Sequence, residues 1–176
     1  MSQIKTQKNR LVGKMRAELC RINLKCVIVG AIIILLCGFL SSLAGGSTEV
    51  YRELERPAGA PPSFVFPIVW TILYILIGGA AGAVACNQER ALESEKYKGL
   101  LFFILMMIFN FVWSPLFFAA EAYFAAFCAI IMMIILSFFA TLCFFRIYIV
   151  SALAMAVYLL WLFYAAYLNL AIIILN

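Results

Sequence analysis

The chain holds three tryptophans, Trp70, Trp113 and Trp161, and each lies inside a long apolar stretch. Aromatic rings that converge inside a helical bundle can stack on a planar ligand, at about 0.5–1.5 kcal/mol for each well-placed pair. Membrane tryptophans more often form a belt at the water interface. Because these three lie several residues inside their stretches, the pattern favours binding of a flat hydrophobic molecule, with the belt as an alternative.

Helical spacing extends each tryptophan into a stripe along one face, since residues three or four positions apart share a side of a helix. The stripes are Trp70, Tyr74 and Gly78; Phe103, Met106, Asn110, Trp113, Ser114 and Phe117; and Tyr158, Trp161, Ala165 and Asn169. Ordinary packing between helices produces the same period and stays open as an alternative.

Two asparagines are polar groups within the stripes. An amide in lipid must find hydrogen-bonding partners, so Asn110 and Asn169 are expected to face the interior. They either bond neighbouring helices or hold the polar edge of a ligand. Gly78 and Gly82 form a small-residue contact face, for packing within the chain or for a homodimer. Pro67 and Pro115 are expected to bend their helices around a cavity.

Conventional catalytic groups are absent from the apolar stretches. The chain has no histidine, and Glu121 and Arg146 stand at the boundaries of these stretches. Histidine-based catalysis, ordinary acid–base chemistry and ion-coupled transport therefore lack an agent. We predict no catalytic residue, no metal site and no cofactor. The six cysteines show no C-x-x-C spacing and are predicted to be small apolar packing residues rather than disulfide partners.

The elements that must position these residues are membrane-spanning helices. Hydrophobic residues make up 67% of the 176 positions and charged residues only 12%, against about 25% charged in soluble domains. Charge-free gaps are long enough for the ~20 residues that cross a bilayer as a helix. We predict an all-α membrane protein, a five-transmembrane-helix bundle, with spans near 27–45, 63–86, 99–119, 123–145 and 150–175. These form one transmembrane domain over 27–176.

Basic residues predict the orientation. Eleven of the 13 lysines and arginines fall in the N-terminal segment and the second and fourth connections, and only Arg52 and Arg56 in the first connection. The positive-inside rule then places the N-terminus in the cytoplasm and the C-terminus outside. Orientation already explains the net charge of +5, so nucleic acid is not an expected partner.

The N-terminal segment, residues 1–26, allows two interpretations. Leu11, Met15, Leu19, Ile22 and Cys26 recur at three- or four-residue steps among the basic residues. This spacing indicates an amphipathic basic helix on the anionic inner leaflet over residues 8–25. A disordered tail that only enforces topology is the alternative.

Three motifs stand out along the chain. The first runs from Tyr51 through Arg56-Pro57 and Pro61-Pro62 to Trp70 and Tyr74. The others are Asn110-Phe111-Val112-Trp113-Ser114-Pro115-Leu116-Phe117-Phe118, and Tyr158 and Trp161 followed by Ala165 and Asn169. Together these motifs resemble the translocator protein family, also called the tryptophan-rich sensory proteins, TspO/MBR or peripheral benzodiazepine receptor family. The resemblance covers about residues 30–176 with the same five spans.

The resemblance implies an often dimeric bundle that binds porphyrins and other hydrophobic ligands, and so regulates tetrapyrrole handling or a stress response. It implies a bacterial cell membrane and a pocket open to the side of the first connection. The first connection, which includes Pro61 and Pro62, is too proline-rich to be helical throughout, and we expect it to fold as a lid over this end of the bundle. Residues 170–175 lack the cholesterol-recognition segment of animal members, so sterol binding is not implied. Porphyrin degradation by the pocket tryptophans, and transport without ion coupling, are the alternative functions. The implied pocket positions are Tyr51, Trp70, Tyr74, Asn110, Trp113, Ser114, Phe117, Trp161 and Ala165.

Overall fold

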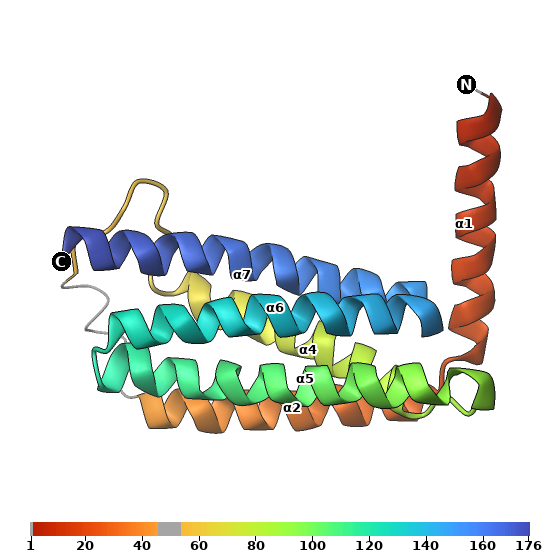
Figure 1. Cartoon of the computed structure of the whole chain (residues 1–176), viewed down its shortest axis with the longest axis horizontal. Coiled ribbons are helices and arrows are strands. Elements are labelled where there is room, and N and C mark those ends of the chain that lie inside the picture. The colour runs from red at the N-terminus through yellow and green to blue at the C-terminus, as the bar shows by residue number, and fades with distance from the viewer. Residues whose placement is uncertain (1, 46–53) are drawn as a thin grey trace.

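The computed structural model describes residues 2–45 and 54–176, and Tyr51 therefore lies outside the described residues. Long helices make up most of this part (Figure 1). They are α1 (Ser2–Arg21), α2 (Leu24–Gly45), α4 (Val65–Ala85), α5 (Glu93–Ser114), α6 (Tyr123–Ile147) and α7 (Ile149–Leu175). A short 3₁₀ turn, η1 (Arg90–Leu92), precedes α5, and a π-helical turn, η2 (Pro115–Ala119), follows it.

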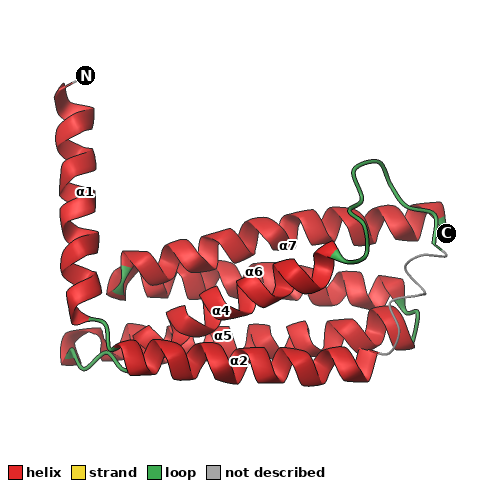
Figure 2. Ribbon diagram, turned by 180° about the vertical axis from the view of Figure 1, so that it is seen from behind, coloured by secondary structure: helices red, strands yellow, loops and turns green. Residues whose placement is uncertain are grey.

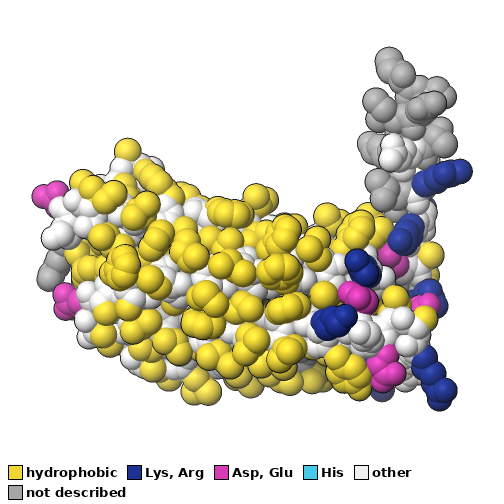
Figure 3. Space-filling view, viewed as in Figure 1, with side chains coloured by type: hydrophobic (Ala, Val, Ile, Leu, Met, Phe, Trp, Pro, Cys, Tyr) yellow, Lys and Arg dark blue, Asp and Glu magenta, His cyan; other side chains and the backbone are white. Residues whose placement is uncertain are grey.

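Five helices of the described chain are long and apolar enough to cross a membrane, which confirms the predicted fold class. They are α2, α4, α5 with its flanking turns, α6 and α7. Their outward faces carry large apolar side chains, such as Ile32 on α2 and Phe145 on α6, in a continuous apolar surface (Figure 3). Lipid can solvate such a surface and water cannot.

The five spans pack as a closed ring. Helix α5 packs on α6, α6 on α7, α7 on α4, α4 on α2, and α2 on α5. The view from behind shows α4 between α2 and α7 (Figure 2). Fully buried side chains from α4, α5, α6 and α7, among them Ile77, Met106, Met133 and Met155, fill the centre of the ring. The site described below lies toward one end of this core.

Helices α2 and α4 approach each other through glycines. A side chain at Gly30 would overlap the carbonyl oxygen of Gly78 and stand 2.9 Å from the Cα of Gly82. Because only hydrogen fits there, the two backbones can touch directly. The Gly78–Gly82 face therefore packs within the chain, which is one of the two uses that the spacing allowed.

One prediction about the cysteines is wrong. Cys26 and Cys86 form a disulfide, with their Cα atoms 6.4 Å apart. Because α2 begins where α4 ends, the glycine contact brings together two residues that are 60 positions apart in the chain. Spacing along the sequence carries no sign of such a contact. The other four, Cys20, Cys37, Cys128 and Cys143, are free.

The two prolines act differently from each other. Pro67 lies in the first turn of α4, where a helical N–H has no partner to lose, so the expected bend does not arise there. Pro115 starts the π-helical turn η2, in which the N–H of Ala120 donates to the carbonyl of Pro115 at 2.9 Å. This turn widens the end of α5 and changes which side chains face inward.

Charged side chains gather at the two ends of the bundle (Figure 3). The end formed by α1, the α4–α5 connection and the α6–α7 connection carries Arg21, Arg90, Lys98 and Arg146. Among the described residues, the opposite end holds Glu55, Arg56 and Glu121. The basic groups that the sequence assigned to one side of the membrane thus lie at one end.

The glycine contact predicts a stability effect. Gly30→Ala should lower the unfolding temperature of the purified protein in detergent, because the added methyl forces α2 away from α4 at a cost of about 1–3 kcal/mol. The control is Gly13→Ala on α1, where no atom of the described residues lies within 4 Å of the added carbon. Equal unfolding temperatures for the two variants would contradict the close contact.

Candidate functional site

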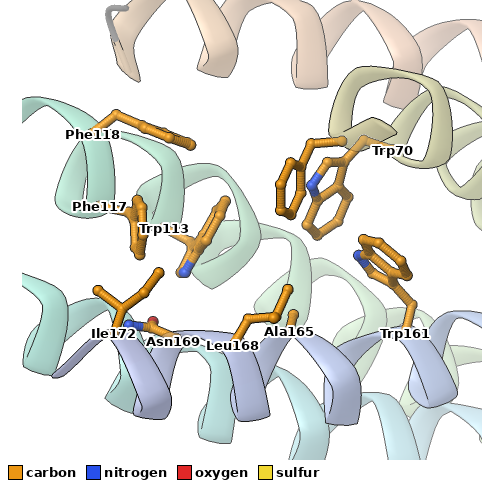
Figure 4. A pocket seen from close by; sticks show the side chains of 10 residues that line it. Trp70, Trp113, Phe117, Phe118, Trp161, Ala165, Leu168, Asn169 and Ile172 are labelled. Carbon is orange, nitrogen blue, oxygen red and sulfur yellow. The ribbon is translucent and has the colours of Figure 1, made fainter. Parts of the chain in front are cut away.

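The three tryptophans meet inside the bundle (Figure 4). The cavity beside them is lined from the end of α5 and from the C-terminal half of α7. The ring centroid of Trp70 lies 6.1 Å from that of Trp113 and 6.5 Å from that of Trp161. Trp70 comes from α4, Trp113 from α5 and Trp161 from α7, so three helices each supply one indole. Packing of α4 against both α7 and α5 sets this convergence.

These rings surround a small apolar cavity. Its walls are formed by Phe66, Trp70, Trp113, Phe117, Phe118, Trp161, Ala165, Leu168, Asn169 and Ile172. The cavity measures about 20 Å³, which is room for one water molecule. The rings therefore pack almost completely against one another in this conformation.

The π-helical turn η2 supplies two neighbouring phenylalanines to the wall. In a regular α-helix, consecutive side chains point about 100° apart, yet Phe117 and Phe118 both line the cavity. Phe117 stacks on Trp113 with centroids 5.2 Å apart, and Phe118 meets the same indole edge-on at 5.8 Å. The local widening after Pro115 thus places a second aromatic ring at the site.

A chain of hydrogen bonds lies on the core side of Trp70. The hydroxyl of Tyr74 donates to Oδ1 of Asn110 at 2.7 Å, and Nδ2 of Asn110 donates to the hydroxyl of Tyr158 at 2.8 Å. Tyr158 in turn reaches Sδ of Met133 at 3.7 Å. The amide of Asn110 therefore joins α4, α5 and α7. Of the two roles that the sequence allowed for Asn110, the structure shows hydrogen bonding between helices.

The polar atoms that face the cavity are, in contrast, unsatisfied. Among the described residues, Nε1 of Trp113, Nε1 of Trp161 and Oδ1 of Asn169 are buried without a hydrogen-bonding partner. Asn169 is only 2% exposed, and its amide nitrogen donates to the carbonyl of Tyr123 at 3.1 Å. Buried polar atoms are nearly always paired in folded proteins. Two donors and one acceptor are thus available to a bound molecule.

The loop before α4 is attached to α7. The hydroxyl of Tyr164 donates to the carbonyl of Gly59 at 2.8 Å, and that of Tyr167 donates to the carbonyl of Ala58 at 3.0 Å. At the end of α7, the amide of Asn176 exchanges two hydrogen bonds with the backbone of Glu55. Residues 54–64 are thereby held beside the helix that carries Trp161 and Asn169 (Figure 2).

The structure brings together half of the predicted site residues around the cavity: Trp70, Trp113, Phe117, Trp161, Ala165 and Asn169. Tyr74 and Asn110 lie behind Trp70 in the hydrogen-bonded chain. Ser114 faces α2, where its Oγ is the first atom that a side chain at Gly45 would meet. Pro61 and Pro62 lie in the 54–64 loop and do not line the cavity. Tyr51 is outside the described residues.

Four lining residues were not among the predicted ones: Phe66, Phe118, Leu168 and Ile172. Phe66 stands four residues before Trp70, and Leu168 and Ile172 continue the α7 face beyond Ala165, so extending the helical stripes would have found them. Phe118 depends on the π-helical turn, which a regular period does not predict.

Comparison with known proteins gives one consistent result. The sequence profile described as the TspO/MBR family matches residues 29–175. Over 126 residues the chain is 32% identical to the "Tryptophan-rich protein TspO" of Chlorobaculum tepidum, covering 72% of this chain and 78% of that protein. It is 32% identical over 128 residues to "Protein CrtK" of Rhodobacter capsulatus, with the same coverage. A "Tryptophan-rich protein TspO" of Archaeoglobus fulgidus is 29% identical over 156 residues, 88% of this chain and 99% of that protein.

The chain of hydrogen bonds predicts a cost for losing its central amide. Asn110→Leu leaves the hydroxyls of Tyr74 and Tyr158 buried without this partner, which should destabilise the bundle by about 1–3 kcal/mol for each unpaired group. Unfolding in detergent measures the loss. The triple variant Tyr74→Phe/Asn110→Leu/Tyr158→Phe should recover most of it, since no polar atom is then stranded. If the triple variant is as unstable as Asn110→Leu alone, the loss of stability comes from altered packing and not from unpaired hydroxyls.

Proposed function

The chain belongs to the TspO/MBR family, and from this premise we propose that it binds porphyrins or other hydrophobic small molecules as a membrane receptor or carrier. The binding site is the cavity between α4, α5 and α7. Ligand binding there would regulate tetrapyrrole handling or a stress response. The observation that carries this proposal is the convergence of three indoles, two of them with an unpaired N–H, inside a lipid-solvated bundle.

Stacking is the main attraction that this site offers. A porphyrin is a wide, flat aromatic ring system, and the cavity walls are aromatic on the α4 and α5 sides and include Trp161 on α7. Each ring that stacks or meets the ligand edge-on contributes about 0.5–1.5 kcal/mol. A site built from several such rings suits a large planar ligand better than a compact one.

The size of the cavity requires a rearrangement on binding. A space of about 20 Å³ is far below the roughly 300–1,000 Å³ of ordinary ligand pockets. The rings of Trp70 and Trp161 must therefore separate, and their edge-to-face contact at 6.5 Å is replaced by contacts with the ligand.

The unpaired polar atoms can fix the orientation of a stacked ligand through hydrogen bonds. The two indole N–H groups can donate to acceptor atoms of the ligand, and Oδ1 of Asn169 can accept from a donor. An unpaired buried group costs about 1–3 kcal/mol, so a ligand that satisfies all three gains more than contact area alone. Holding the polar edge of a ligand was one of the two roles considered for the asparagines, and we propose it for Asn169.

Access is proposed from the side of the 54–64 loop. With the basic end of the bundle in the cytoplasm of a bacterial cell, the C-terminus and the cavity lie toward the outside, and the loop acts as the lid. A homodimer is compatible with this arrangement, although its interface is not the Gly78–Gly82 face, which packs on α2.

If the cavity is the binding site, the affinity for a porphyrin should depend on the indole of Trp161. Protoporphyrin IX titrated into the protein in nanodiscs should quench tryptophan fluorescence with saturation. Trp161→Ala should weaken the affinity by roughly two- to tenfold, the equivalent of one lost stacking pair. The matched control is Phe163→Ala, an aromatic on the same helix that is 54% exposed on its outer side.

Equal affinities for the wild type, Trp161→Ala and Phe163→Ala would contradict this site. A new tetrapyrrole product that forms in light and is lost in Trp161→Phe would show instead that the protein degrades the ligand.

A second prediction concerns the lid. Tyr164→Phe/Tyr167→Phe removes both hydroxyl bonds that hold Gly59 and Ala58 to α7, so a bound porphyrin should dissociate faster. Stopped-flow recovery of tryptophan fluorescence measures this rate. Tyr97→Phe serves as control, because Tyr97 is exposed near the start of α5, at the other end of the bundle. An unchanged dissociation rate would exclude the loop as a lid.

A further inference from the structure

Helix α1 carries two different faces. Val12, Met15 and Leu19 follow one another at three- and four-residue steps and form an apolar stripe. Val12 and Leu19 are 44% and 56% exposed, so this stripe is only partly covered by the bundle. Arg10, Lys14 and Arg21 fall on the opposite side, by the same helical spacing, and are exposed.

Two polar contacts fix this helix to the bundle. The carboxylate of Glu18 accepts a hydrogen bond from the backbone N–H of Ile149 at 2.8 Å, at the first residue of α7. A negative charge is favourable at that position because helix N-termini carry unpaired N–H groups and a positive dipole end. Arg21 stands 3.8 Å from Glu89 at the α4–α5 connection. Glu18 is only 8% exposed, which makes this contact part of the fold.

The contacts set the direction of α1. The helix runs across the ends of the spans rather than along them, and its N-terminal part projects beyond the bundle (Figure 1). If the spans cross a bilayer, a helix in this direction lies along the bilayer surface. The projecting part then lies above lipid, with no protein beneath it (Figure 2).

We propose that α1 is a membrane-surface helix that binds anionic lipid headgroups through Arg10 and Lys14. The apolar stripe enters the boundary between headgroups and acyl chains, and the basic face reaches the headgroup phosphates. Within the described residues, Arg10 and Lys14 have no acidic partner, so both charges are available to a negative surface. The TspO/MBR profile begins at residue 29, so family membership does not account for this helix.

The exposed apolar stripe favours a lipid surface over a soluble acidic partner. A soluble polyanion would engage the basic face and leave Val12 and Leu19 in water, whereas a bilayer satisfies both faces at once. The other basic groups at this end, Arg90 and Lys98 among them, would lie at the same headgroup level (Figure 3).

Amide hydrogen exchange of the full-length protein in nanodiscs tests the proposal. Exchange over residues 7–20 is compared in phosphatidylcholine alone and in phosphatidylcholine mixed with phosphatidylglycerol. The anionic discs should slow exchange, and added salt should reduce the difference because it screens surface charge. In Arg10→Gln/Lys14→Gln the protection should fall by about fivefold for each basic residue removed. The matched control, Arg90→Gln/Lys98→Gln, removes the same charge at the same end and should retain it.

Three results would overturn the proposal. The first is equal exchange of α1 in the two kinds of disc. The second is loss of protection in the control variant to the same extent as in Arg10→Gln/Lys14→Gln. The third is slowing of exchange in neutral discs by a soluble polyanion such as heparin, equal to that produced by anionic lipid, which would identify a soluble acidic partner. Unchanged exchange in α4 shows in every case that the bundle is folded.

Discussion

The amide of Asn110 is the polar group on which the arrangement of the site depends. Lipid offers no hydrogen bonds, so a polar side chain in a membrane bundle must be satisfied by the protein itself. Asn110 accepts from Tyr74 on α4 and donates to Tyr158 on α7, and these two bonds fix three helices relative to one another. Both tyrosine rings pack against Trp70, with centroids 5.4 and 6.3 Å away. The position of the central indole thus follows from a hydrogen-bonded amide below it rather than from apolar packing alone.

The site divides into a satisfied floor and an unsatisfied interior. Below Trp70, the hydroxyl and amide groups of the Tyr74–Asn110–Tyr158 chain have partners. On the cavity side, Nε1 of Trp113, Nε1 of Trp161 and Oδ1 of Asn169 lack them among the described residues. This arrangement is suited to recognition. The floor is already ordered when the protein folds, so binding need not order it, and a ligand can form hydrogen bonds with the three unpaired atoms above it. In the proposed binding mode, opening involves the walls and the loop, and the floor is expected to keep its geometry.

Much of this architecture could be predicted from the sequence, because lipid enforces simple rules. Charge-free gaps gave the five spans, and the three- and four-residue stripes placed Trp70, Trp113 and Trp161 in one interior. Three features could not be predicted from regular helical spacing. Two are contacts between distant residues: Cys26 meets Cys86 only because glycines let α2 and α4 touch, and Ser114 turns to α2. The third is local, since Phe118 reaches the cavity through the π-helical turn after Pro115. The 3.6-residue period of an α-helix no longer predicts which side chains face inward where the helix becomes π-helical.

In the proposed binding mode, the aromatic walls separate to admit a planar ligand above the Asn110 floor. A structure of the protein with protoporphyrin IX tests this most directly. We predict that the porphyrin lies between Trp70 and Trp161, with its polar atoms bonded to the indole N–H groups and to Asn169, and that the three hydrogen-bonded residues of the floor do not move. A porphyrin on the lipid-facing surface, with the indoles still packed around the same cavity of about 20 Å³, would contradict it.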